Sequence, residues 1–215
     1  ARPGFLQCSR WGDHLSVAEG FAAQSGLPLS ITTAFYYQDA RVMEKIARAL
    51  GKVEDARRYG VLAGSIRNAF NNRWFHPDGN CYDNGTQTPQ ALALAFGLTP
   101  EGREKAVLKT LADDLEKQDW HLTTGYPGTF VLVNALTNCG RPDIVWRLAK
   151  QKTCPSWLFM MKERSTVPET WKGGGSWNHH ALASPIDAWF YTVLAGIRCD
   201  ESVPGFEHFS IKPYI

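Results

Sequence analysis

Apolar residues recur every three to four positions along most of the chain, which is the period of an amphipathic α-helix. Residues 30–50 carry one such stripe, and Gly51 follows it in the position that a helix-ending glycine commonly takes. Residues 53–74 repeat the pattern after a very short connection, which predicts an antiparallel helical hairpin. The positions predicted to face the core are Ile31, Ala34, Phe35, Val42, Ile46, Ala49 and Leu50 in the first helix, and Tyr59, Leu62, Ala63, Ile66, Phe70 and Trp74 in the second.

The helical pattern continues beyond this hairpin, with two interruptions. Turn-forming residues at 76–80 predict a tight turn flanked by two short strands, and the alternation over 205–215 predicts a strand. Further helices are expected over 87–97, from Pro100 onward, and over 128–139, 142–152, 156–162 and 181–197, the last with Leu182, Ile186, Trp189, Phe190, Val193 and Ile197 in line. About eight helices in antiparallel pairs, without a fixed 34- or 40-residue repeat, favour closure into a toroid over an open array. The fold class is therefore predicted to be all-α.

Composition and charge exclude several classes of protein. The chain has 215 residues, of which 44% are hydrophobic, enough for one large domain or part of a larger one. Its net charge of +2 comes from interspersed charges, so neither a nucleic-acid footprint nor a polybasic membrane patch is predicted. No apolar run approaches the roughly 20 residues that a membrane span needs. The cysteines are scattered without a Cys-x-x-Cys pair and are predicted to be mostly free, a single disulfide staying open: Cys8, Cys81, Cys139, Cys154 and Cys199.

Four polar, aromatic and glycine-rich stretches stand where helices should be joined, at 11–14, 85–88, 120–129 and 167–180. Loops gathered at one end of a rigid scaffold are where binding residues concentrate. The chain also has eight tryptophans, whose faces suit the C–H surfaces of sugars. Three of these lie at helical spacing with other apolar residues and are assigned to the core: Trp74, Trp146 and Trp189.

The polar stretches hold candidate site residues whose roles the spacing alone leaves open. Glu169 stands two residues before Trp171, and desolvation by an indole can favour the neutral acid used in proton transfer; an exposed loop glutamate is the alternative. His179 and His121 suit hydrogen bonding to sugar hydroxyls or a packing role, and Asp13 suits a helix cap or a hydroxyl acceptor. No metal site is predicted, because no cysteine or carboxylate lies at a ligand spacing from the adjacent pair of histidines at 179–180. No cofactor is predicted.

Nine short motifs follow one another along nearly the whole chain. They are Trp-Gly-Asp-His at 11–14, Thr-Ala-Phe-Tyr-Tyr at 33–37, Ala-Leu-Gly-Lys-Val-Glu-Asp-Ala-Arg-Arg-Tyr at 49–59, Thr-Gln-Thr-Pro-Gln-Ala-Leu-Ala-Leu at 86–94, His-Leu-Thr-Thr-Gly-Tyr-Pro-Gly-Thr at 121–129, Cys-Pro-Ser-Trp-Leu-Phe-Met at 154–160, Thr-Val-Pro-Glu-Thr-Trp at 166–171, Asn-His-His-Ala-Leu-Ala-Ser at 178–184 and Phe-Ser-Ile-Lys-Pro at 209–213. In this order they resemble the catalytic domain of bacterial α-L-rhamnosidases of glycoside hydrolase family 78.

The resemblance implies a fold and a reaction. The fold is an (α/α)6 barrel with β domains around it. Residues 1–200 would form part of this barrel, and residues 201–215 would begin a C-terminal β segment. The reaction is hydrolysis with inversion that releases terminal α-linked L-rhamnose, with Glu169 as the general base. The substrate-binding residues would be Trp11, Asp13, His121, Tyr126, Trp171 and His179.

Three departures from the family pattern bear on function. The family's Trp-Glu-Arg-Trp becomes Pro-Glu-Thr-Trp at 168–171, and its Gly-Asp-Trp becomes Gly-Asp-His at 12–14, which removes one aromatic wall. The family's general acid lies upstream of the position of Trp11, and no such motif occurs here. The remainder of a catalytic domain upstream of Ala1 is therefore an expected partner, and the isolated chain is expected to have little activity.

Two other functions stay open on the sequence. A polysaccharide lyase on the same scaffold would release an unsaturated uronate that absorbs in the ultraviolet, and a non-catalytic module would bind rhamnose without cleaving it. A periplasmic or extracellular location is favoured over a cytoplasmic one.

Overall fold

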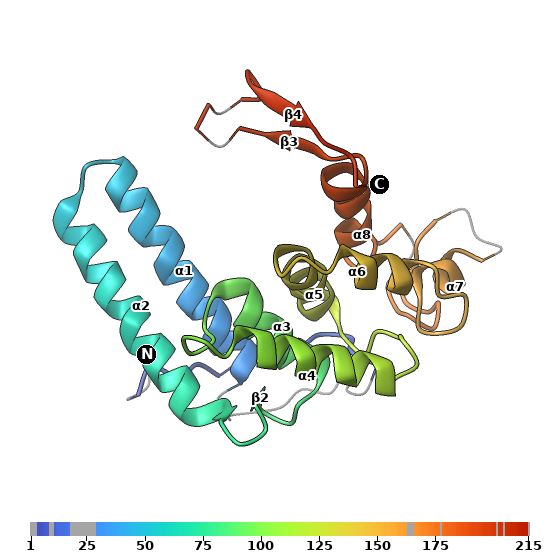
Figure 1. The fold of residues 1–215 in the computed structure, drawn as a ribbon, viewed down its shortest axis with the longest axis horizontal. Helices are drawn as coiled ribbons and strands as arrows, with labels where there is room; N and C mark the ends of the chain where they lie inside the picture. The colour runs from blue at the N-terminus through green and yellow to red at the C-terminus, as the bar shows by residue number, and fades with distance from the viewer. Residues whose placement is uncertain are drawn as a thin grey trace.

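The computed structural model describes residues 4–8, 11–17, 29–162, 166–176, 178–200, 202–203 and 205–214. Helices dominate these ranges and follow one another mostly in antiparallel pairs (Figure 1). They are α1 (Ser30–Ala49), α2 (Val53–Trp74), α3 (Gln87–Phe96), α4 (Glu104–Lys117), α5 (Tyr126–Asn138), α6 (Pro142–Ala149), α7 (Trp157–Met161) and α8 (Ser184–Trp189), the last continued by a π-helical turn over Phe190–Leu194. The fold class predicted from the hydrophobic period is confirmed.

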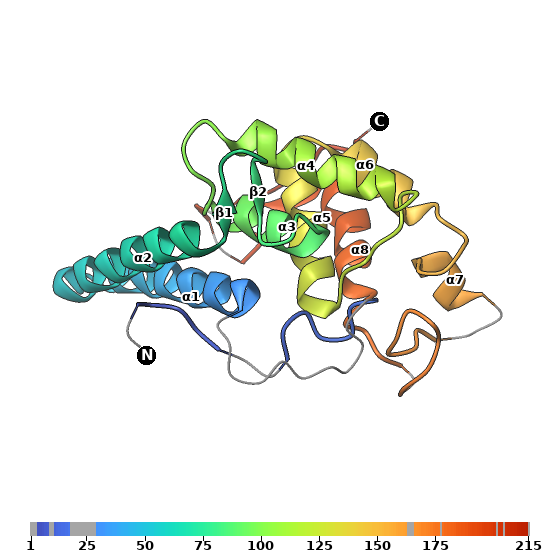
Figure 2. The same ribbon diagram turned by 90° about the horizontal axis from the view of Figure 1, so that it is seen from below.

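The helices form two rows. Each of α1, α3 and α5 packs against the helix that follows it, α2, α4 and α6 respectively. Within the first row α3 packs against α1 and α5, and α5 packs against α8, so the chain alternates between an inner and an outer row. Figure 2 shows the loop over residues 11–17 passing the beginnings of α1 and α5. The segments that lead into α1, α3 and α5 thus meet at one end of the helical scaffold.

The predicted core stripe is correct for α2 and only half correct for α1. Ile66, Phe70 and Trp74 of α2 are buried. In the second half of α1, however, Val42, Ile46 and Leu50 are exposed, and the face turned to α2 carries Ala40, Glu44 and Ala47. Small residues let the two helices approach closely there. The buried carboxylate of Glu44 lies over Gly60 of α2 and pairs with Arg41 and Arg48, so its charge is compensated inside its own helix.

Three further predictions about the helices are wrong. Trp146 is 42% exposed instead of belonging to the core, and the ammonium of Lys150 lies 5.5 Å from its ring centroid. Helix α4 begins at Glu104 and not at Pro100, because Gly102 in between has a positive φ of 76°. The helix predicted over 181–197 starts at Ser184 and ends before Gly196, which has a φ of 69°.

Two short antiparallel strand pairs complete the described structure. Strands β1 (Phe75–His76) and β2 (Cys81–Tyr82) flank the turn at 76–80, as predicted. In the tail, β4 (Phe209–Ile211) pairs with β3 (Ile197–Cys199), a strand that the sequence did not predict and whose first residue falls in the predicted last helix. The pairing joins residues on both sides of the domain boundary expected at residue 200, and that boundary stays a prediction.

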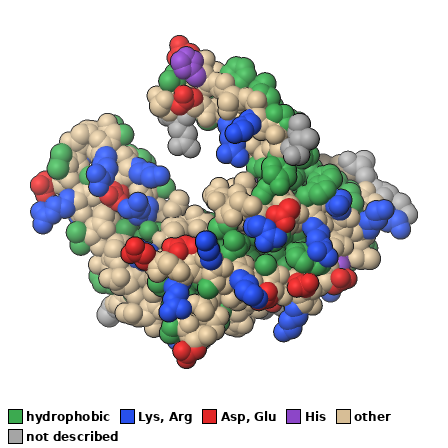
Figure 3. Space-filling model, in the orientation of Figure 1, with side chains coloured by type: hydrophobic (Ala, Val, Ile, Leu, Met, Phe, Trp, Pro, Cys, Tyr) green, Lys and Arg blue, Asp and Glu red, His purple; other side chains and the backbone are tan. Residues whose placement is uncertain are grey.

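The structure also bears on the predictions about disulfides and membrane-spanning segments. All five cysteines lie in described ranges, and none of them forms a disulfide. No helix in the described part of the chain is long and apolar enough to cross a bilayer. The face seen in Figure 3 carries positive and negative side chains interspersed.

Candidate active site

A tight turn over residues 169–176 holds the predicted catalytic carboxylate. The N–H of Glu169 donates to the carbonyl of Ser176 at 3.0 Å, and the N–H of Thr170 donates to the carbonyl of Gly174 at 3.2 Å. Gly175 has a φ of 83°, and a Cβ at this position would stand 2.5 Å from Oε2 of Glu169. Glycine is therefore required for the turn to close on the carboxylate.

The Glu169 carboxylate is ionised, and one of its two oxygens is hydrogen-bonded within the protein. Its Oε2 accepts hydrogen bonds from the N–H and from the Oγ of Ser176, both at 2.8 Å. These two bonds, with smaller contributions from the nearby His179 and His14, hold the pKa of Glu169 below its ordinary value of 4.5. Among the described residues no donor reaches Oε1. Of the two interpretations that the sequence left open, the surroundings match the exposed loop glutamate, because the carboxylate is solvated and hydrogen-bonded.

Trp171 is part of the core and does not present its indole to a ligand. Its side chain is 3% exposed, its Nε1–H donates to the carbonyl of Thr124 at 2.8 Å, and its ring meets Trp157 edge to face at 5.9 Å. The prediction that Trp171 contacts a sugar face directly is thus contradicted. Trp171 instead anchors the turn that carries Glu169 to the segment leading into α5.

Tyr126 and His179 lie against the same turn. The hydroxyl of Tyr126, the first residue of α5, donates to the carbonyl of Glu169 at 2.8 Å. Burial and the charge of Glu169 raise the pKa of Tyr126 to about 12, so this hydroxyl keeps its proton at neutral pH. The ring of His179 stacks on that of Tyr126 at 5.1 Å, and its buried Nδ1 has no hydrogen-bond partner among the residues that the structure describes.

Two aromatic residues of the N-terminal loop extend this cluster. The ring of His14 meets the edge of Tyr126 at 5.6 Å and the ring of Trp11 at 5.0 Å. Trp11 is 63% exposed, so much of its indole surface faces solvent. The structure thus brings together Trp11, Tyr126, Glu169 and His179, whose functional roles stay predictions. It adds His14, which sequence reasoning had treated as the loss of an aromatic wall, although an imidazole is itself an aromatic surface.

Asp13 is a partly buried cap for α5, and both of its carboxylate oxygens accept hydrogen bonds from the protein. Its Oδ2 accepts from the N–H of Gly125 at 2.9 Å and from Oγ1 of Thr88 at 2.5 Å, and its Oδ1 accepts from the N–H of Gly128 at 2.8 Å. Burial raises the pKa of Asp13, and the three hydrogen bonds oppose that shift. Both oxygens are committed to protein donors. The sequence suggested that Asp13 could cap the turn directly after it. The helix that Asp13 caps, α5, instead begins more than a hundred residues later.

His121 is turned away from this cluster. Its Nδ1 lies 3.1 Å from the carbonyl of Gln118 and its Nε2 lies 2.7 Å from Oγ1 of Thr153. A carbonyl can only accept, so Nδ1 carries the proton and Nε2 accepts from Thr153. Both ring nitrogens are used inside the protein, which does not match the predicted contact with a sugar hydroxyl. The backbone of the loop is held by the buried side chain of Gln87, a residue that sequence reasoning missed.

No group of three or more potential metal ligands occurs among the residues that the structure describes. The stacked pair His179 and His180, with ring centroids 5.9 Å apart, therefore has no third ligand beside it in those ranges. The arrangement offers one ionised carboxylate, one neutral hydroxyl and a set of aromatic faces, which together suit proton transfer next to an uncharged, partly apolar ligand.

Comparison with known proteins identifies similar chains. Residues 6–194 match the family described as the bacterial alpha-L-rhamnosidase 6 hairpin glycosidase domain. The alpha-L-rhamnosidase of Alteromonas sp. (strain LOR) is 34% identical over 198 residues, which are 86% of this chain and 21% of that protein. The chain spans about a fifth of the length of the curated relatives that it matches.

Solved structures of similar chains share the fold. The crystal structure of Streptomyces avermitilis alpha-L-rhamnosidase complexed with L-rhamnose matches with a TM-score of 0.84 and 32% identity, over 99% of this chain and 21% of that one. The structure of alpha-L-rhamnosidase from Dictyoglumus thermophilum matches with a TM-score of 0.85 and 30% identity, over 99% of this chain and 25% of that one. The prediction of helical hairpins from a six-hairpin barrel is confirmed.

Proposed function

Because this chain belongs to the bacterial α-L-rhamnosidase six-hairpin glycosidase family, we propose that the protein containing it hydrolyses terminal α-L-rhamnosides with inversion. The observation that carries the proposal is the state of Glu169. One of its carboxylate oxygens is fixed by Ser176, its pKa is lowered, and its other oxygen is left for a reacting group. A general base needs to be ionised, oriented and open on one side.

In the proposed reaction, Oε1 of Glu169 takes a proton from a water molecule that attacks the anomeric carbon. The leaving oxygen departs from the opposite face and is protonated by a second carboxyl group. In inverting glycosidases the two carboxyl groups stand roughly 6.5–9.5 Å apart, which leaves room for the water. The proposal assigns this acid to the remainder of the catalytic domain, upstream of Ala1.

The aromatic cluster supports binding of the sugar ring. The exposed indole surface of Trp11 suits the apolar C–H side of a deoxysugar, which rhamnose presents through its methyl group. The buried Nδ1 of His179 lacks a partner within the described ranges, and such atoms normally acquire one from a ligand or from ordered water. Tyr126 and His14 would set the positions of His179 and Trp11 through the ring contacts already described.

Hydrolysis of an aryl α-L-rhamnoside by the full-length protein, followed by proton NMR, tests this function. The first product is expected to be β-L-rhamnose, because a single displacement inverts the anomeric centre. Initial release of α-L-rhamnose would contradict inversion while leaving hydrolysis intact. With a polysaccharide of rhamnose and uronate as substrate, release of an unsaturated uronate that absorbs in the ultraviolet would favour a lyase, and calorimetric binding of rhamnose without turnover would favour a binding module.

The fall of kcat/KM at low pH, the acid limb of the pH profile, is expected to depend on Ser176. A base works only when it is deprotonated, so kcat/KM should fall as the pH drops through the lowered pKa of Glu169, below 4.5. Ser176→Ala removes the Oγ donor and keeps the N–H, so the acid limb should move to higher pH. The measurement is kcat/KM against pH on the aryl rhamnoside, with Ser65→Ala on the exposed side of α2 as the matched control. An unmoved limb would argue against Glu169 as the base.

A further inference from the structure

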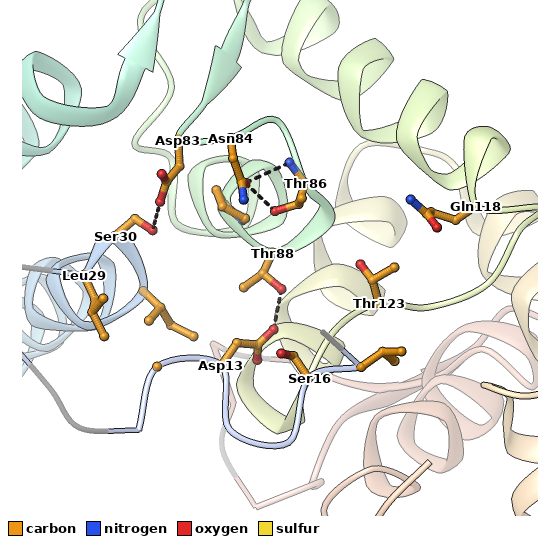
Figure 4. Close-up of a pocket in the computed structure, with 14 residues that line it drawn as sticks. Asp13, Ser16, Leu29, Ser30, Asp83, Asn84, Thr86, Thr88, Gln118 and Thr123 are labelled. Atoms are coloured by element: carbon orange, nitrogen blue, oxygen red, sulfur yellow. Dashed lines mark hydrogen bonds between the residues drawn. The ribbon is translucent and has the colours of Figure 1, made fainter. Parts of the chain in front are cut away.

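A cavity of about 510 Å³, lined by both polar and apolar residues, opens between the N-terminal loop and the beginnings of α1 and α3 (Figure 4). Its walls come from residues 12–17, 29–31, 83–89 and the segment over 118–123, which are the loops and helix starts at one end of the scaffold. Its size lies within the range of roughly 300–1,000 Å³ typical of small-ligand sites. The proposed mechanism makes no use of this cavity.

The cavity adjoins the catalytic cluster through two consecutive residues. Asp13 lines the cavity with its side chain, while the ring of the next residue, His14, contacts Tyr126 on the catalytic side. Consecutive Cα atoms are about 3.8 Å apart. The turn at 12–14 thus contributes Asp13 to the cavity and His14 to the catalytic cluster, so the cavity and the cluster are neighbours.

Asp83 and Asn84 form a donor and acceptor pair on the rim of the cavity. Oγ of Ser30 donates to Oδ2 of Asp83 at 3.0 Å, and no described residue donates to Oδ1. Oδ1 of Asn84 accepts from the N–H and the Oγ1 of Thr86, which fixes the amide and leaves Nδ2 as a donor. A carboxylate oxygen beside an amide N–H₂ complements a pair of neighbouring hydroxyls, since each hydroxyl both donates and accepts.

The charge of the cavity restricts the ligand. Asp13 and Asp83 line it, and no lysine or arginine is among its described lining residues. An anionic ligand would face two carboxylates without a compensating cation, which is unfavourable in a partly enclosed site. Hydroxyl-bearing threonines and serines, Thr88 among them, complete a surface suited to a neutral polyol.

The geometry points to the cavity as the binding position for a neutral sugar, the leaving-group sugar to which terminal rhamnose is attached, held by Asp83 and Asn84. This inference rests on the proposed hydrolase function and narrows its substrate class to rhamnosides of neutral sugars over rhamnosides of uronates. An aryl leaving group without hydroxyls would make none of these contacts.

The test compares three substrates in the full-length protein: an aryl α-L-rhamnoside, rhamnosyl-glucose and rhamnosyl-glucuronate. In Asp83→Asn, the amide oxygen still accepts from Ser30, whereas an N–H₂ group replaces the carboxylate oxygen Oδ1 that would accept from the sugar. The kcat/KM for rhamnosyl-glucose should therefore fall roughly tenfold. Asn84→Ala should have a similar effect. Neither variant should change kcat/KM for the aryl rhamnoside. Asp83→Asn should also reduce the ratio of kcat/KM for rhamnosyl-glucose to kcat/KM for rhamnosyl-glucuronate. Asp113→Asn, an exposed carboxylate on α4, is the matched control.

The outcomes separate the inference from the proposed function. Equal losses on all three substrates, no loss on any of them, or a wild-type preference for the glucuronate would each overturn the inference while hydrolysis stands. If the wild type hydrolyses none of the three, the proposed function fails. In that case calorimetry with rhamnosyl-glucose tests whether the cavity binds the sugar. The inference requires that the wild type binds rhamnosyl-glucose and that Asp83→Asn binds it roughly tenfold more weakly.

Discussion

Replacing Glu169 by glutamine in the full-length protein is expected to lower kcat on an aryl α-L-rhamnoside by about 10²–10⁴-fold, the usual contribution of a general base. Glutamine has nearly the same shape, and its amide oxygen can still accept the two hydrogen bonds from Ser176. The amide cannot take a proton from water, however. The loss should therefore fall on kcat, with KM little changed.

The fold should tolerate this substitution. Glu169 lies at the surface, and the turn is held by backbone hydrogen bonds at 3.0 and 3.2 Å, by the Tyr126 hydroxyl and by the Trp171 indole, none of which uses the carboxylate. Glu116→Gln, an exposed glutamate at the end of α4, serves as the matched control and should keep full activity. Turnover by Glu169→Gln within a few-fold of the wild type would contradict the assignment of the base.

The sequence predicted the helices well and their packing faces less well. A period of 3.6 residues locates α2 because its buried face is built from large apolar side chains such as Ile66 and Phe70. In α1 the buried face carries alanines and Glu44, and the larger Val42 and Ile46 point outward. Hydrophobicity alone assigns the larger residues to the core, because it does not register the close approach that Gly60 permits or the ion pairs that satisfy Glu44.

At the candidate site, the sequence singled out residues that the structure brings together only in part, and it misjudged their surroundings. The order of the loop motifs singled out Glu169 and His179, which the structure places in one cluster. The state of Glu169 depends on Ser176, seven residues later, and on the left-handed conformation of Gly175, which closes the turn. Trp171 was assigned to the ligand because a tryptophan in a loop suits both stacking and anchoring. Its 3% exposure and its hydrogen bond to Thr124 distinguish the two.

Asp13→Ala is expected to destabilise the full-length protein by about 2–4 kcal/mol, because it leaves buried N–H groups of Gly125 and Gly128 without an acceptor. Asp13→Asn keeps one acceptor oxygen and the shape of the side chain, so its loss should be clearly smaller. Gly128→Ala should resemble Asp13→Ala, since a Cβ there would overlap the carboxylate. Urea unfolding followed by tryptophan fluorescence measures these differences.

Asp13 is also expected to act on activity through the residues that it positions. Its carboxylate joins the loop carrying Trp11 and His14 to the beginning of α5, where Tyr126 donates to the carbonyl of Glu169. Leu111→Ala in the core of α4 should cost a comparable 2–5 kcal/mol without touching this connection. At a temperature where both variants are folded, Asp13→Ala should lose kcat on the aryl rhamnoside, Asp13→Asn should recover part of it, and Leu111→Ala should keep it. Equal kcat for Asp13→Ala and Leu111→Ala would reduce Asp13 to a stabilising residue, because a positioning role requires that the loss follow the hydrogen bonds and not the stability.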